Sequence, residues 1–113
     1  RRARPSLLND GLSFHGLQLN PETMRVTRDG DDIHLGSKEF RLLSVLIERP
    51  ERVFAREQLL DMVWGHGVYV DDRTVDVHMS RLRRALNKRA DGGEDRPDMI
   101  RTVRGAGYSL TQG

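Results

Sequence analysis

The sequence predicts an α+β fold in which short strands come first, three helices follow, and a β-hairpin closes the chain. Three observations support this prediction. Residues 11–35 contain β-prone runs separated by turn residues, three later segments have helical periodicity, and two β-prone runs flank Gly105-Ala106-Gly107. At 113 residues the chain is long enough for one domain with a single modest core.

The N-terminal part is predicted to form short strands joined by tight turns. The β-prone runs are residues 12–14, 16–19, 24–28 and 33–35. Asn20-Pro21 and the stretch DGDD at 29–32 are the predicted turns. Within DGDD, Asp29-Gly30 indicates a hairpin because both residue types tolerate positive φ. A hairpin turn is preferred to a calcium loop, since the ligand spacing and closing glutamate of such a loop are missing.

Two amphipathic helices are predicted next. The first spans about 36–49, and its apolar residues at helical spacing are Phe40, Leu43, Leu46 and Ile47. The second spans about 56–64, with the inward residues Leu59, Leu60 and Val63. Pro50 and Gly65 end the two helices. Ala55 stands at the N-cap of the second helix, where it offers no side-chain acceptor.

The third predicted helix, 71–88, has two faces of opposite character. One face is apolar and contains Val75, Met79, Leu82 and Leu86 at i, i+4, i+7 and i+11. At about 100° per residue, five residues fall within roughly 40° of the opposite pole: Arg73, Val77, Arg81, Arg84 and Lys88. Asp71 or Asp72 can cap its N-terminus. We expect one face to enter the core and the other to meet an anionic partner.

Positive charge is concentrated on this third helix. Residues 73–89 contain six Lys and Arg and one acidic residue, a net charge of +5. Residues 1–72 carry −2 and residues 90–113 carry −1. A solvated helix face usually mixes opposite charges at i,i+4, but only Asp76 is available here. The pattern favours a nucleic-acid-binding face over a face that is merely solvated.

The order of elements is that of a winged helix-turn-helix, in which the third helix enters the major groove and the hairpin lies beside it. The predicted reading face consists of Arg73, Thr74, Val77, Arg81 and Arg84. Ser80 and Arg83 lie at its edges, where phosphate contacts are favoured. His78 lies beside the apolar stripe, where a packed, hydrogen-bonded histidine is favoured over a base contact.

The predicted C-terminal hairpin carries a second candidate contact. Gly105 and Gly107 permit a tight turn, and Arg104 comes directly before it. An arginine at a hairpin tip can enter a narrow, negative minor groove, and Thr102 has a hydroxyl for a phosphate. A dinucleotide-binding loop would need G-x-G-x-x-G before a helix, and only G-x-G is present.

Several other classes of protein are excluded. The four histidines are scattered without ligand spacing, and neither G-x-S-x-G nor a P-loop occurs. We therefore expect no enzyme activity, no cofactor and no metal. The chain has no cysteine, which excludes a disulfide framework and fits a cytoplasmic protein. It contains no run suited to a membrane span or a signal peptide.

The chain begins with Arg1 rather than Met, in a basic, proline-containing run, RRARPS. We expect residues 1–10 to be the remnant of an interdomain linker. Residues 11–113 are then one DNA-binding domain.

Three runs resemble a known family: PERVFAREQLLDMVWG, VYVDDRTVDVHMSRLRRAL and IRTVRGAGY. Over about residues 12–111 the chain is similar to the OmpR/PhoB-type effector domains of bacterial response regulators. The run WGHGVYVDDRTVDVH is most similar to the regulators of phosphate-starvation genes. The resemblance implies a four-stranded N-terminal sheet, three helices and a C-terminal wing. It also implies an upstream receiver domain, absent from this chain, which a sensor kinase phosphorylates and which then promotes dimerisation.

The resemblance assigns roles to single positions. It implies DNA contacts from the recognition helix, the wing and the end of the second helix, at Arg73, Thr74, Val77, His78, Arg81, Arg83, Thr102, Arg104 and Trp64. It implies contacts with the RNA polymerase sigma subunit at Glu57, Trp64, Gly65 and Asp72. Such domains bind tandem direct repeats as head-to-tail dimers. Two positions depart from the pattern: Ser80 stands where an arginine is common, and Ala55 where a capping serine is common.

The expected function is therefore sequence-specific binding of double-stranded DNA and regulation of transcription, including activation. The alternative is a winged-helix protein-interaction module whose basic face docks an acidic partner. RNA binding is disfavoured because aromatic residues make up only 5% of the chain and form no stacking platform.

Overall fold

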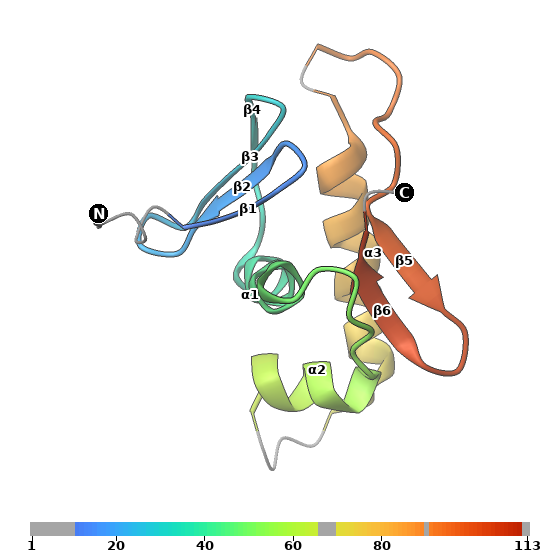
Figure 1. The fold of residues 1–113 in the computed structure, drawn as a ribbon. Coiled ribbons are helices and arrows are strands. Elements are labelled where there is room, and N and C mark those ends of the chain that lie inside the picture. The colour runs from blue at the N-terminus through green and yellow to red at the C-terminus, as the bar shows by residue number, and fades with distance from the viewer. Residues whose placement is uncertain (1–10, 66–69, 90, 112–113) are drawn as a thin grey trace.

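The structure, a computed structural model, describes residues 11–65, 70–89 and 91–111. The strands of the first sheet are β1 (Leu12–Phe14), β2 (Leu17–Asn20), β3 (Arg25–Arg28) and β4 (Asp31–Ile33). The helices are α1 (Ser37–Glu48), α2 (Arg56–Val63) and α3 (Arg73–Asn87). The C-terminal hairpin, called the wing below, consists of β5 (Ile100–Val103) and β6 (Gly107–Leu110). The predicted winged helix-turn-helix is confirmed (Figure 1).

Two parts of the sequence prediction lie outside the described residues. These are the linker remnant at 1–10 and residues 66–69 of the connection between α2 and α3. Within the described ranges, no helix is long and apolar enough to cross a membrane.

The N-terminal sheet is antiparallel throughout, in the order β1-β2-β3-β4. Side chains alternate between its two faces, so Leu17, Leu19, Val26 and Ile33 are buried on one face. Gln18 and Asp32 are exposed between them. The sheet therefore contributes one apolar face to the core.

The position of β4 corrects the prediction. Asp29 and Gly30 form the predicted tight turn, with φ values of 52° and 88°. A turn of two residues lets pairing resume at Asp31, which is opposite Arg28. The strand therefore covers residues 31–33 rather than 33–35, and the second half of DGDD is strand rather than turn. Likewise β3 begins at Arg25 because Met24, with φ of 58°, belongs to the preceding turn.

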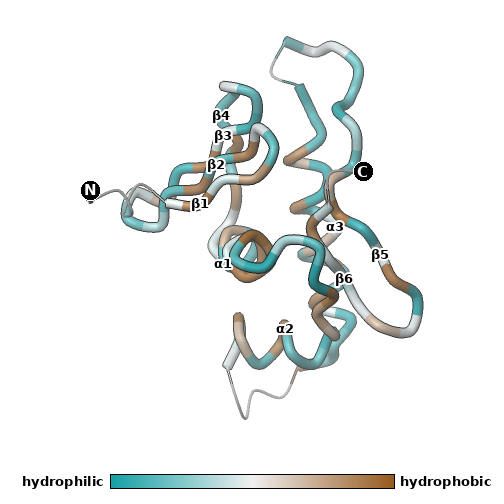
Figure 2. The backbone as a smooth tube through the Cα atoms, in the orientation of Figure 1, coloured by the Kyte–Doolittle hydropathy of each residue, from teal (hydrophilic) through white to brown (hydrophobic). Residues whose placement is uncertain are grey.

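Helix α1 lies at the centre of the fold, where it contacts β1, α2, α3 and β6 (Figure 1). Its predicted core residues are buried, and Leu42 joins them. Hydrophobic segments recur along all three helices, whereas the segment before β5 is mostly hydrophilic (Figure 2). The core thus connects the sheet to α3 through α1.

The wing is extended by a short third segment that the sequence pattern did not indicate. Phe54 donates its N–H to the Tyr108 carbonyl at 2.8 Å and accepts the Tyr108 N–H at 2.9 Å. Gly107 is required at this crossing, because a Cβ there would lie 1.8 Å from the Phe54 carbonyl oxygen. The residues before α2 therefore hold β6 where it leaves the wing turn.

Candidate nucleic-acid interface

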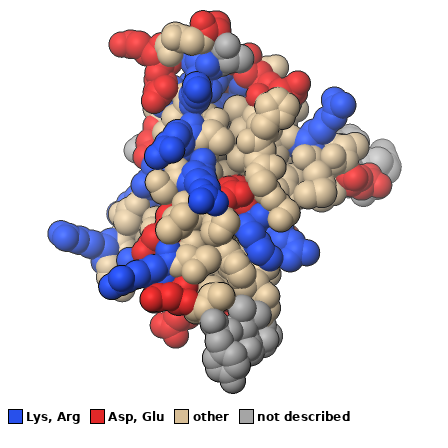
Figure 3. Space-filling view, turned by 180° about the vertical axis from the view of Figure 1, so that it is seen from behind, with Lys and Arg blue, Asp and Glu red and all other residues tan. Residues whose placement is uncertain are grey.

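The two predicted faces of α3 are present. Val75, Met79, Leu82 and Leu86 are all 0% exposed, and they pack into the core. The predicted opposite face is exposed, including Val77 at 50%. Seen from behind, Lys and Arg side chains run down this side of the molecule (Figure 3). The helix therefore presents a cationic surface on which Arg73, Arg81 and Arg84 are exposed.

Four arginines on this surface are available to a partner. Arg73, Arg81 and Arg84 are exposed on α3, and Arg104 is exposed in the wing turn. Within the part of the chain that the structure describes, their guanidinium groups form no hydrogen bond or ion pair. A guanidinium that is still hydrated can exchange its water for phosphate or guanine oxygens.

The N-terminus of α3 is capped by Asp71. Its Oδ1 accepts the Arg73 N–H at 3.0 Å, and that hydrogen bond holds the pKa of Asp71 below its usual range. Asp72, the residue at the N-cap position, makes no side-chain cap hydrogen bond. Of the two predicted capping residues, Asp71 therefore does the capping. Thr74, another predicted contact, is half-buried in the first turn.

Arg83 does not lie free at the edge of the reading face. Its Nη2 donates to the Ile100 carbonyl at 2.7 Å and to Thr102 Oγ1 at 2.8 Å. Its Nε lies 2.9 Å from Asp98 Oδ2. These contacts join α3 to β5. The two predicted DNA-contacting residues Arg83 and Thr102 are thus brought together, and Arg83 is half-buried between helix and wing.

His78 is the packed, hydrogen-bonded histidine that the sequence favours. Its Nδ1 lies 2.5 Å from Glu39 Oε2, and its ring centroid lies 5.3 Å from that of Trp64. Burial raises the pKa of Glu39, but the bond with His78 and the nearby charges outweigh burial and lower it overall. The His78 side chain is occupied inside the protein, which does not favour the base contact that the resemblance implies.

Trp64 follows the last residue of α2 and is half-buried. The ammonium of Lys38 lies 5.5 Å from its ring centroid, a cation–π distance. Gly65 follows with a φ of 104° and ends the helix as predicted. The end of α2 is therefore fixed against the start of α1 beside α3.

Asp76, the only acidic residue of α3, faces the wing. Its Oδ1 accepts the Tyr108 O–H at 2.6 Å and lies 3.0 Å from Arg56 Nε. Burial, together with this hydrogen bond, raises the pKa of Tyr108 to about 12, so the phenol stays protonated at neutral pH. The sequence showed that Asp76 was isolated among basic residues, but not which residues it would pair with.

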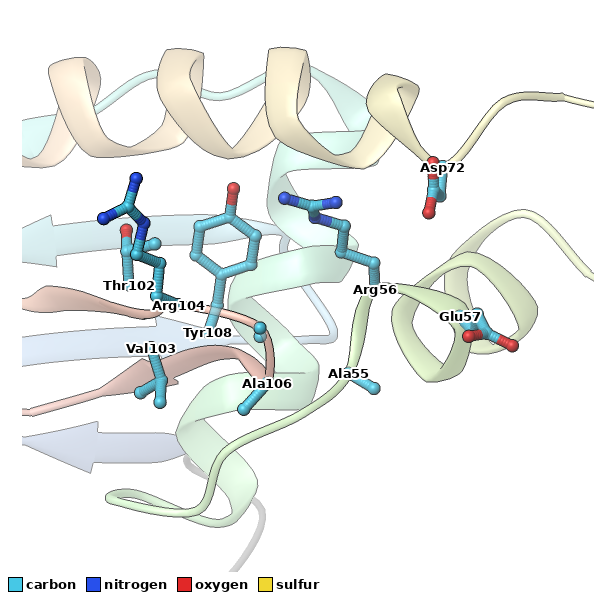
Figure 4. A pocket seen from close by; sticks show the side chains of 11 residues that line it. Ala55, Arg56, Glu57, Asp72, Thr102, Val103, Arg104, Ala106 and Tyr108 are labelled. Atoms are coloured by element: carbon cyan, nitrogen blue, oxygen red, sulfur yellow. The ribbon is translucent and has the colours of Figure 1, made fainter.

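A cavity of about 220 Å³ separates the wing from the starts of α2 and α3. Glu57, Asp72, Thr102 and Arg104 all contribute to its lining. In the close view, Thr102 and Arg104 come from the wing, Arg56 extends toward α3, and the Glu57 carboxylate turns away (Figure 4). Predicted DNA-contacting and polymerase-contacting residues therefore border the same groove, although Glu57 and Arg104 point in different directions.

Two buried arginines brace the other end of α3. Arg28 of β3 donates to the Leu86 carbonyl at 2.9 Å, to Asn87 Oδ1 at 3.0 Å and to the Pro97 carbonyl at 2.6 Å. Arg96 donates to the Lys88 carbonyl and forms ion pairs with Asp29 and Asp31. Cations at a helix C-terminus also complement its dipole. These arginines were not singled out in the sequence, because their acceptors are distant along the chain.

No group of acidic and histidine side chains in the described ranges could hold a metal ion. The features that remain are an exposed cationic helix on a helix-turn-helix scaffold and a wing with an exposed arginine. Together they define a winged-helix domain of the kind that binds DNA.

The family model described as "Transcriptional regulatory protein, C terminal" matches residues 30–110, and the chain belongs to this family. It is 56% identical over 110 residues to the phosphate regulon transcriptional regulatory protein PhoB of Rhizobium meliloti. That match covers 97% of this chain and 46% of the relative. The PhoB protein of Escherichia coli K12 is 48% identical over 111 residues, with 98% and 46% covered. The chain thus spans less than half the length of these relatives.

Solved structures of DNA-binding domains have the same fold as this chain. The DNA-binding domain of CpxR from E. coli superimposes with a TM-score of 0.71 at 36% identity, covering 88% of this chain and 94% of that one. The Klebsiella pneumoniae RstA DNA-binding domain, in complex with the RstA box, gives 0.74 at 32%, covering 88% and 95%. The chain is therefore a C-terminal domain of the transcriptional regulatory protein family, which is not a family of enzymes, and its fold is that of OmpR/PhoB DNA-binding domains.

Proposed function

We propose that α3 reads the major groove of double-stranded DNA while Arg104 of the wing enters the adjacent minor groove. The observation that supports this most strongly is a set of four exposed arginines whose guanidinium groups form no hydrogen bond or ion pair within the described residues. Arg81 and Arg84 lie on the exposed face of α3, where a guanidinium can chelate guanine or contact phosphate. Thr74, Val77 and Ser80 complete the helix contacts, and Thr102 adds a phosphate contact from the wing.

We further propose that the chain is the output domain of a response regulator of phosphate-starvation genes. Its sequence identity of 56% and 48% to two PhoB proteins supports this proposal. A receiver domain upstream of residue 1 would be phosphorylated by a sensor kinase in the cytoplasm. Phosphorylation would then favour head-to-tail dimers on tandem direct repeats. In this arrangement the domain needs no cofactor of its own.

We propose that RNA polymerase contacts a neighbouring surface, which borders the same groove as the wing. Glu57, Trp64, Gly65 and Asp72 are proposed to meet the sigma subunit. Because Asp71 already caps α3, the carboxylate of Asp72 is not needed as a cap. Glu57 is exposed and its carboxylate turns away from the wing (Figure 4). Two acids beside a DNA-binding face suit a basic protein partner better than they suit DNA.

The DNA part of this proposal is tested by selecting bound sequences from a random duplex library. We expect enrichment of tandem direct repeats with A·T-rich flanks at the positions where the wing would lie. Enrichment of single, unrepeated sites would contradict the head-to-tail arrangement. Equal retention of all sequences, together with capture of acidic peptides, would instead favour the protein-interaction module.

The polymerase surface is tested with Glu57→Ala in the full-length regulator. We expect operator affinity within about threefold of the wild type, a change well under 1 kcal/mol, and loss of promoter activation. Met62→Ala, at an exposed position of the same helix, serves as a control that should still activate. Normal transcription by the Glu57 variant at saturating occupancy would exclude this surface as the polymerase contact.

A further inference from the structure

Helix α3 contacts both strands of the wing through two residues seven positions apart. A spacing of seven places Asp76 and Arg83 on one side of the helix. Asp76 accepts the Tyr108 O–H of β6 at 2.6 Å. Arg83 donates to the Ile100 carbonyl and to Thr102 Oγ1 of β5, at 2.7 and 2.8 Å. We call this set of contacts the clamp.

The two wing residues of the clamp are direct partners in the hairpin. Thr102 is opposite Tyr108 in the β5–β6 register, so their side chains leave the same face of the wing. The close view shows the Tyr108 ring rising from β6 toward α3 (Figure 4). The helix therefore contacts both strands of the hairpin at the same pair of opposed residues, Thr102 and Tyr108.

Each side of the clamp has a second support. Arg56, the first residue of α2, lies 3.0 Å from the same Asp76 oxygen that Tyr108 contacts. Asp98 lies 2.9 Å from Arg83 Nε and also accepts the Ile100 N–H at 3.1 Å. Tyr108 is 7% exposed, so water competes little for its hydroxyl. Such linked contacts restrict orientation more than one exposed pair would.

The clamp lies next to the proposed minor-groove contact. Arg104 follows Thr102 by two residues, at the turn of the same hairpin. The position of its guanidinium relative to Arg81 depends on the angle between wing and helix. An error of one ångström in such placement is enough to weaken a geometric contact.

We propose that Asp76 and Arg83 are positioning residues that set the angle of the wing against α3. They thereby couple the minor-groove contact of Arg104 to the major-groove contacts of Arg81. This inference rests on the proposed function, in which the wing reads the minor groove. It assigns to Asp76, an acid within the DNA-binding helix, a role that requires no contact with DNA.

The test uses the 113-residue chain and four duplexes. Each duplex has a core for the major-groove contacts of α3 and a flank for the wing. The core is either the sequence selected from the random library or an altered version of it, and the flank is either A·T-rich or G·C-rich. Tyr108→Phe keeps the buried ring and removes only the hydroxyl. We expect it to lower the preference for the A·T-rich flank by about two- to tenfold, the value of one net hydrogen bond. Discrimination of the core should stay within about twofold of the wild type.

Matched variants separate positioning from general stability. Ser44→Ala removes a hydroxyl that donates to the Phe40 carbonyl in α1, remote from the wing, and should leave both preferences unchanged. Asp76→Asn keeps an oxygen that can accept from Tyr108, so it should retain the flank preference that Asp76→Ala loses. Because both Asp76 variants remove a negative charge, their affinity for all duplexes can rise. The ratio between flanks is therefore the deciding measurement.

Three results would overturn the inference. If Tyr108→Phe and Asp76→Ala keep the wild-type flank preference, the clamp does not position the wing. If Tyr108→Phe weakens binding equally on all four duplexes while lowering the melting temperature, the contact is only structural. If the wild type itself has no flank preference, the proposed minor-groove role fails and the clamp's effect on it fails too.

Discussion

Arginine serves opposite purposes at the exposed face of α3 and at its C-terminal end. On the exposed face Arg73, Arg81 and Arg84 extend into solvent. At the C-terminal end Arg28 is 5% exposed and Arg96 is 7% exposed. The comparison separates two groups of arginines among the described residues. One group is available to DNA, and the other holds the helix that presents it.

The difference lies in what replaces water around each guanidinium. A buried guanidinium is stable only when protein oxygens satisfy its donors. Carbonyl oxygens around the end of α3 satisfy Arg28, and Asp29 and Asp31 satisfy Arg96. The exposed arginines keep their water until an anion displaces it. Substitutions in the two groups should therefore affect different properties.

The largest effect is expected for Arg28→Met, which should lower the free energy of unfolding by about 2–4 kcal/mol. The variant leaves the Leu86 and Pro97 carbonyls without their donor. Arg25→Met changes an exposed arginine of the same strand and should cost less than about 0.5 kcal/mol. Urea unfolding measures both variants. Equal midpoints for the two would refute the division into buried and exposed arginines.

The next effect concerns the exposed group. Arg81→Ala should cost about 1–3 kcal/mol of binding on the preferred site and relax base preference there. Arg104→Ala should instead reduce the preference for A·T-rich flanks, because groove width is read at that position. Neither variant should shift the urea midpoint. Uniform loss of affinity across all duplexes would show that both arginines contact only phosphates.

A smaller effect is expected at the start of α2. Gln58 Oε1 already accepts the Ala55 N–H at 2.9 Å, so one half of a capping box is present. Ala55→Ser would supply the other half and should stabilise the domain by about 1 kcal/mol. Ala106→Ser, in the wing turn, is the control and should leave the midpoint unchanged. If the urea midpoint of the Ala55 variant is no higher than that of the wild type, the added hydroxyl does not cap the helix.

The smallest effect is expected for Glu39→Gln and depends on pH. The pKa of Glu39 is lowered from 4.5, so the folded state binds its proton less tightly than the unfolded state does. The resulting stability is present above about pH 4.5 and is lost as pH falls through the lowered pKa. At pH 7 the variant should be less stable by about 0.5–1 kcal/mol. Denaturation at several pH values should show that the difference in stability between wild type and variant shrinks in acid. A difference that stays constant with pH would contradict this explanation.

Local patterns predicted the elements well because each one depends on neighbouring residues. The helical period identified Val75, Met79, Leu82 and Leu86 as core residues, and all four are fully buried. Asp29-Gly30 identified the hairpin turn. The end of that turn was misplaced, because strand pairing and not residue type decides where β4 begins. The pairing of Phe54 with Tyr108 was missed for the same reason.

The candidate site was predicted only in part. Periodicity placed Arg81 and Arg84 on the exposed face, as observed. It could not show that Arg83 turns toward Ile100 and Thr102, or that His78 pairs with Glu39. Those contacts join residues 17 to 39 positions apart, and the fold alone brings them together. Residue type indicates which groups can bind DNA, but protein acceptors decide which of them stay free.

We infer that the exposed arginines of α3 and the wing bind duplex DNA in a sequence-specific way. Fluorescence anisotropy on a direct-repeat duplex over a range of salt concentrations tests it most directly. With about four to six phosphates neutralised, the logarithm of affinity should fall with a slope near −4 or −5 per log unit of salt. A scrambled duplex should bind more weakly at every salt concentration. Affinity that is independent of salt, or equal for both duplexes, would contradict the claim.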